Sequence, residues 1–175
     1  ARVLVNRVWQ AHFGDGLVRS PDNFGSLGEK PSHPELLDWL ATEFVRNGWS
    51  IKSLHRLILN SAVWQQTTDF NDAADTIDPE NRLLSRMNRR RLEAEAIRDS
   101  LLAIGGDLDT AMGGTLLPTE NRKYVTSTAN INIDVYEAPR RTIYLPVVRS
   151  ALNDYLTAFD FGDPSAMSGQ RERTT

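Results

Sequence analysis

The segment from Gly28 to Gln65 constrains the fold more than any other part of the chain. Two apolar runs recur in it at helical spacing, namely Leu36, Leu37, Leu40, Ala41, Phe44 and Val45, then Ile51, Leu54, Leu57, Ile58 and Val63. The connection between the two helices is only about three residues long, so the helices must be close neighbours. The segment therefore predicts an α-helical hairpin.

The ends of the first predicted helix carry residue types that cap helices. Ser32, followed by Pro34 and Glu35, matches a capping box with a proline in the first turn. Asn47 and Gly48 favour a left-handed conformation just after the last turn. We therefore expect this helix to begin after Ser32 and to end at Asn47.

The second helix of the hairpin raises the question of DNA binding. Ser50 is its predicted N-cap, and Trp49 is expected to fill the corner between the two helices. A DNA-reading helix–turn–helix has a similar length. However, this helix offers little beyond Lys52, His55 and Arg56 that could reach base edges. We expect a packed hairpin and no DNA partner.

Helical patterns also cover much of the remaining chain. One runs to Phe13, and others are predicted from Asp78 to Met87, from Leu92 to Ile104 and from Ala151 to Ala158. The acidic segment Thr67–Asp78 carries aspartates at every third position. A calcium loop needs ligands at alternate positions, so we predict a solvated loop without a metal.

Two stretches rich in β-branched and aromatic residues, Tyr124–Thr128 and Thr142–Arg149, predict short strands. Pro146 confines the second to an edge or a bulge. The fold class is thus mainly α, a helical bundle of hairpins, with a small β-ribbon in the C-terminal third. We expect a single domain over all 175 residues, with a helical part at 1–106, a β-ribbon arm at 115–150 and a C-terminal tail at 151–175.

Composition excludes several kinds of chemistry. The chain has no cysteine, so it can form neither a disulfide nor a thiolate metal site. No apolar run is long enough to span a membrane, and a net charge of −3 predicts no polyanionic partner. No nucleophile elbow, glycine-rich phosphate loop or zinc-protease motif occurs. We find no catalytic motif, and an enzymatic function is not predicted.

The strongest charged feature is a run of arginines. Its members form a candidate anion-binding or contact face: Arg86, Arg89, Arg90, Arg91 and Arg98. Guanidinium groups bind phosphate and carboxylate in a bidentate manner. The alternative, which we favour, is that they are internal struts that pair with Glu93, Glu95, Asp99 and the acidic loop.

Five other residues form a candidate polar cluster. His12, His33 and His55 match no metal-ligand spacing, and each alone is more often a structural residue than a ligand or base. Asp107 and Asp109 could act as a metal or acid–base pair, but aspartates that follow a double glycine are usually turn residues. A pocket that gathers the histidines with carboxylates would favour an enzyme.

Several blocks of the sequence resemble one family, the planctomycete PSD family, a domain of unknown function. The blocks are Asn6–Val18, Pro21–Ala41, Gly48–Leu59, Asp78–Asp109 and Phe159–Thr175, and the resemblance extends over essentially the whole chain. Members often carry a secretion signal, a cytochrome-c-like haem domain with a CxxCH signature and a second planctomycete-specific domain. This chain contains no CxxCH, so any haem is expected in a neighbouring domain of the parent protein.

The resemblance implies an excerpt of a larger, extracytoplasmic protein, at the cell surface or in the periplasm. The expected function is a non-catalytic interaction or structural module, with other domains of the same polypeptide as partners, a cytochrome-c-like one among them. A component of an enzyme or a carbohydrate-processing system is the alternative, and nucleic-acid binding is the least favoured reading. No cofactor is expected in the chain itself.

Overall fold

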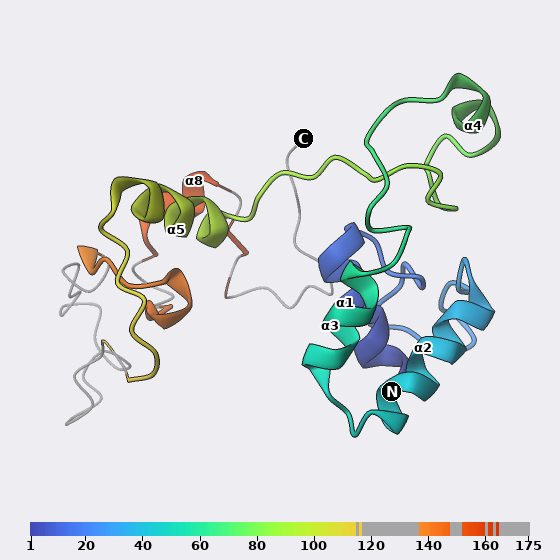
Figure 1. Ribbon diagram of the computed structural model, residues 1–175, viewed down its shortest axis with the longest axis horizontal. Helices are drawn as coiled ribbons and strands as arrows, with labels where there is room; N and C mark the ends of the chain where they lie inside the picture. The colour runs from blue at the N-terminus through green and yellow to red at the C-terminus, as the bar shows by residue number, and fades with distance from the viewer. Residues whose placement is uncertain (115, 117–136, 148–151, 160, 163, 165–175) are drawn as a thin grey trace. The chain divides into compact units, whose positions relative to one another are not determined.

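The computed structural model describes residues 1–114, 116, 137–147, 152–159, 161, 162 and 164. The chain divides into two compact units, Ala1–Arg90 (unit 1) and Arg91–Thr175 (unit 2), and each is described by itself. Both are helical in their described parts (Figure 1). The predicted class, mainly α, is confirmed. The predicted division at residues 106, 115 and 150 stays a prediction.

Unit 1 is built on three helices, α1 (Arg2–Phe13), α2 (Pro34–Arg46) and α3 (Ile51–Leu59), each of which contacts the other two (Figure 1). A fourth, α4 (Asp72–Ile77), follows them. The helices bury one contiguous core, which consists of Val5, Val8, Trp9, Phe13, Leu17, Val18, Leu37, Leu40, Ala41, Phe44, Leu54 and Ile58. The apolar spacing of the sequence predicts most of this core.

The helical hairpin is confirmed, but its first cap differs from the prediction. Ser50 is the N-cap of α3, and its hydroxyl accepts a hydrogen bond from the Ser53 N–H. The N-cap of α2 is His33, whose side chain makes no capping bond, and Pro34 is the first helical residue. Ser32 instead binds the loop after α1, since its N–H donates to the Leu17 carbonyl at 2.8 Å. The predicted capping box is therefore wrong.

Trp49 does not fill the corner of the hairpin. It has a positive φ of 61° and remains 55% exposed, with its ring edge-on to Phe44 at 5.3 Å between centroids. Gly48, just before it, also has a positive φ, as the helix-end signal predicts. The turn is thus made by backbone conformation, and Trp49 lies across its surface.

The segment that follows α3 differs from the prediction in two places. The acidic loop contains α4, because the Asn71 side chain caps it by accepting from the N–H groups of Ala73 and Ala74. The helix predicted from Asp78 is absent, and turns occupy its place, with positive φ at Asn81 and Leu84.

Side-chain bonds to the backbone explain the missing helix. Asp78 accepts a hydrogen bond from the Leu83 N–H at 2.7 Å, and this bond is the main cause of the lowered pKa of Asp78. The buried Asn81 side chain accepts from the Ser85 N–H at 2.9 Å and donates to the Arg86 carbonyl. Such local bonds compete with those of a helix.

Unit 2 contains α5 (Ala94–Gly105), the short 3-10 helix η1 (Thr142–Tyr144) and α8 (Asp154–Ala158), and α5 packs against both of the others (Figure 1). Gly106, with a φ of 82°, ends α5 in the left-handed conformation. The predicted helices at Leu92–Ile104 and Ala151–Ala158 are thus confirmed, with somewhat different bounds.

The predicted β-ribbon is not supported. Thr142–Tyr144, expected to be extended, form η1, and no strand occurs among the described residues. A parallel bridge joins Asp109 to Arg140 in the described part of unit 2. The other predicted strand, Tyr124–Thr128, lies outside the described residues. No helix of the described chain is long and apolar enough to cross a membrane.

Candidate functional site

The loop after α1 is fastened to that helix by one buried amide. Both ends of the Asn6 amide bind the Val18 backbone, since Nδ2 donates to its carbonyl at 2.9 Å and Oδ1 accepts from its N–H at 2.8 Å. Asn6 is fully buried. A Cβ on Gly16 would lie only 2.5 Å from the Asn6 Nδ2, so this close approach requires glycine. The amide thereby positions the polar residues that follow.

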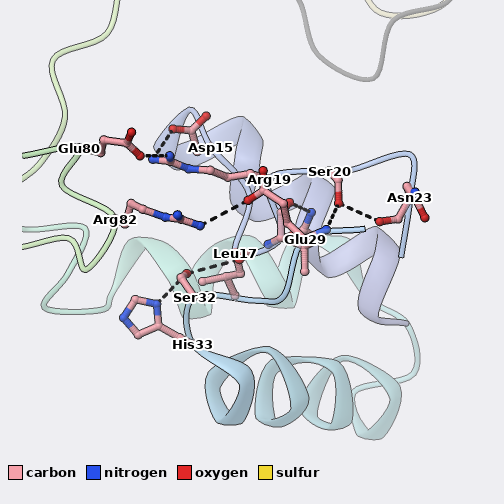
Figure 2. A network of polar contacts seen from close by, with 12 residues as sticks. Asp15, Leu17, Arg19, Ser20, Asn23, Glu29, Ser32, His33, Glu80 and Arg82 are labelled. Carbon is pink, nitrogen blue, oxygen red and sulfur yellow. Dashed lines mark hydrogen bonds and ion pairs between the residues drawn. The ribbon is translucent and has the colours of Figure 1, made fainter. Parts of the chain in front are cut away.

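Arg19 and Arg82 connect this loop to the segment after α4 (Figure 2). The Arg19 guanidinium contacts Glu80 at 2.5 Å and Asp15 at 3.3 Å, and Arg82 contacts Glu29 at 3.3 Å. The carboxylates are half exposed or more, so each pair stabilises the fold only modestly. Together they form a network of alternating charge that leaves little net positive potential for an anion.

The same loop is ordered by a serine hydroxyl (Figure 2). The Ser20 Oγ donates to the Asn23 carbonyl at 2.8 Å and accepts from the Glu29 N–H at 2.8 Å. A Cβ on Gly28 would lie 2.0 Å from the Asn23 carbonyl oxygen, so the chain passes itself closely here. This loop is a compact structural turn.

Arg86 and Arg89, the first two arginines of the candidate face, differ in the contacts that they make. Arg86 contacts Asp75 of α4 at 3.5 Å, and its guanidinium lies 5.1 Å from the centroid of the Phe70 ring. Arg89 is exposed, and neither a hydrogen bond nor an ion pair joins it to any other residue that the structure describes. Arg86 thus contacts the acidic loop, whereas Arg89 makes no such contact among the described residues.

Arg90 holds the C-terminal end of α1. Its Nη1 donates to the carbonyl of Ala11 at 2.7 Å and to that of His12. These carbonyls belong to the last turn of the helix, where backbone acceptors lack helical partners and the helix dipole favours a cation. The sequence could not indicate this role, because the two ends of the contact are 78 and 79 residues apart.

The remaining two arginines of the face belong to unit 2. The Arg91 guanidinium lies 5.7 Å from the Phe159 ring centroid. Arg98, whose side chain is only 11% exposed, donates to the carbonyls of Ala138 at 2.7 Å and Arg140 at 2.9 Å. Burial lowers the pKa of Arg98, and the nearby Asp99 opposes that shift.

A second set of polar contacts in unit 2 surrounds η1. Asp99 of α5 accepts from the N–H of Thr142 at 2.7 Å and from its hydroxyl at 2.6 Å. Arg140 contacts Asp109 at 3.6 Å and lies 4.4 Å from the Tyr144 ring centroid. These contacts explain why Thr142–Tyr144 form a helical turn instead of a strand.

The candidate polar cluster comes together in part. The His12 Nε2 lies 2.7 Å from the His55 Nδ1, so α1 and α3 bring two of the three histidines into contact. His33 is elsewhere in unit 1, with its Nδ1 3.0 Å from the Ser32 Oγ. Asp107 and Asp109 belong to unit 2, and their place in one cluster with the histidines stays a prediction.

Among the described residues, no group of three or more histidines and carboxylates is placed to hold a metal ion. A shallow groove of about 340 Å³ lies between the end of α2 and α3. The groove is lined by both apolar and polar residues, namely Phe44, Leu54, Leu57, Asn47, Asn60, Glu43, Ser53 and Arg56. The side chains that line this groove include no paired groups that could activate a nucleophile.

Three structural residues were missed by sequence reasoning. Asn6 and Asn81 are both buried, and each makes several hydrogen bonds to the backbone or to nearby side chains. Arg19 is the third, through its two acidic contacts. The only available signal was Asn6 itself, a polar residue next to Val5 on the apolar stripe of the first helix.

The arrangement defines a helical domain of two units, in which charged and amide side chains mainly bind backbone groups and one another. The chain belongs to the PSD1 family, described as a protein of unknown function (DUF1553), whose model matches residues 1–175. No curated protein and no solved structure shows significant similarity to the chain.

Proposed function

We propose that the chain is a non-catalytic structural and interaction module of a larger secreted or cell-envelope protein. Its partners in this proposal are other domains of the same polypeptide, including a cytochrome-c-like domain that would hold haem outside this chain. Nothing in the chain is required to perform chemistry. The module's task is to present a rigid helical surface to its neighbours.

The observation that supports this proposal most is the use of the arginines. Arg86, Arg90 and Arg98, which sequence alone offers as an anion site, bind a carboxylate or backbone carbonyls within their own units. An arginine that binds internal acceptors has fewer donors left for a substrate. The candidate chemistry of the run is thus used to stabilise the fold.

Exposed side chains of unit 1 are the second observation that supports the proposal. Trp39 and Trp49 are each more than half exposed, and Arg89 has no partner among the residues that the structure describes. Tryptophan and arginine are the residue types enriched at protein–protein interfaces. We infer that these exposed residues of unit 1 are points of contact with neighbouring domains.

Two arginine variants separate the structural from the interacting role. Arg90→Ala should lower the free energy of unfolding by about 1–3 kcal/mol, because it leaves carbonyls at the end of α1 without a donor. Arg89→Ala should leave stability within about 0.5 kcal/mol but weaken binding to the rest of the parent protein. Stability is measured by urea unfolding, and binding by calorimetry with a parent variant that lacks residues 1–175.

Two results would contradict the proposal, and a third would narrow it. The first is the absence of any binding between the chain and the rest of its parent, and the second is unchanged stability in Arg90→Ala. The third concerns the haem-containing neighbour, which predicts a Soret band in the full-length parent. A parent without such a band would remove the cytochrome from the proposal but leave the structural module.

A further inference from the structure

Two histidines meet ring to ring between α1 and α3. The His12 Nε2 lies 2.7 Å from the His55 Nδ1, and the ring planes are inclined at 73°. At this distance the two nitrogens share one hydrogen, so one of them must carry a proton and the other must not. The contact therefore depends on the protonation state of the pair.

The surroundings of His12 favour its neutral form. Trp64 covers His12 edge-on, with 5.1 Å between ring centroids, and the ring of Phe13 packs against Trp64 in turn. The Arg90 guanidinium, held at the carbonyls of Ala11 and His12, places a permanent positive charge nearby. No hydrogen bond or ion pair joins either imidazole to a carboxylate of the described residues.

The consequence follows from counting protons. A neutral pair makes one N–H···N bond, and a pair with one added proton can keep that bond. A second added proton turns both facing nitrogens into donors, so the bond is lost and two positive rings repel each other beside Arg90. Full protonation is therefore incompatible with the observed contact.

We propose that His12 and His55 form a pH-sensitive clasp, which holds α1 against α3 at neutral pH and opens in mildly acidic solution. The inference does not depend on the proposed function. Trp64 and Arg90 both contact the His12 turn of α1. Opening the clasp would thus also loosen the two segments that carry these residues.

The direction of the pH effect can be worked out from the environment of His12. Burial lowers the pKa of His12 most, followed by the charges of His55 and Arg90. The ring is thus protonated at lower pH in the folded chain than in the unfolded chain, where histidine titrates near about 6.5. Its contribution to stability is complete above that pH and is lost as the pH falls through the folded value.

The test compares thermal unfolding of the whole chain at about pH 7.5 and about pH 5.5, on either side of the ordinary histidine range. We expect Tm of the wild type to fall by on the order of 5 °C. His55→Gln keeps a side chain that can hydrogen-bond with His12 but does not titrate, and it should remove about half of this fall or more. His33→Gln is the matched control and should leave the fall unchanged.

A second measurement uses only the wild type, so that a variant that fails to fold does not decide the matter. Nuclear magnetic resonance of the imidazole nitrogens should show that the His12 and His55 titrations are coupled and occur in separate steps. Independent, single-step titration of the two rings would overturn the proposal. So would an equal fall in Tm for the wild type and a folded His55→Gln.

Discussion

Unit 1 and the described part of unit 2 are stabilised in different ways. Unit 1 buries a contiguous apolar core between α1, α2 and α3. In unit 2 the buried apolar residues are few among those described, namely Ala94, Leu145 and Leu156, and Leu101 and Ile104 of α5 are exposed. Polar side chains of α5, above all Arg98 and Asp99, instead bind the segment that contains η1.

The difference shows which kind of stabilisation can be predicted from sequence. A core between consecutive helices leaves a periodic apolar pattern, and the buried residues of α1 to α3 follow it. A guanidinium that binds carbonyls about 40 residues away leaves no pattern, because any residue can supply the carbonyl. In α5, by contrast, the apolar residues Leu101 and Ile104 lie on the surface.

The largest expected effect tests this contrast directly. Leu37→Ala in the core of unit 1 should cost about 2–5 kcal/mol of unfolding free energy, because Leu37 is 1% exposed and its truncation leaves a cavity. Leu101→Ala, at a position that is 56% exposed, should cost about 0.5 kcal/mol or less. Urea unfolding followed by circular dichroism measures both. Equal costs would show that the α5 face is covered in solution.

The second prediction concerns the polar contacts of unit 2. Arg98→Ala should destabilise this unit by about 1.5–3 kcal/mol, the range for hydrogen bonds to charged groups. The amide of Thr142, which donates to Asp99, should then exchange its hydrogen faster. Arg98→Lys provides the control, since its ammonium keeps the charge without the planar fork that spans two carbonyls. Unchanged exchange in Arg98→Ala would mean that the apolar contacts suffice.

The smallest effect lies within the hairpin of unit 1. Ser50→Ala should cost about 1 kcal/mol, because Ser50 caps α3 through the Ser53 N–H. Ser32→Ala should cost less than about 0.5 kcal/mol, since Ser32 does not cap α2 and its N–H bond to Leu17 is made by the backbone. Thermal unfolding distinguishes the two. A larger loss for Ser32→Ala would mean that its hydroxyl contacts with Leu17 and His33 stabilise the hairpin more than the α3 cap does.

The candidate site could be predicted only as a set of residue types. The arginine run was identified, and the strut interpretation describes Arg86, whose partner Asp75 lies in the acidic loop. Arg90 and Arg98 donate to backbone carbonyls, which the strut interpretation did not name, whereas Asp99, which it did name, lies 3.8 Å from Arg98. Sequence could not indicate this, since the spacing of side chains carries no information on where a distant helix ends.

The sequence by itself determined the helical class, the hairpin of α2 and α3 with its turn at Gly48, and most residues of the unit 1 core. These features depend on interactions between residues close in the chain, which helical periodicity and capping residues record. Only the tertiary structure decided that Thr142–Tyr144 form a helical turn, that Asn6 holds Val18, and that His12 meets His55. Each of these depends on contacts between distant segments, whose geometry the whole fold sets.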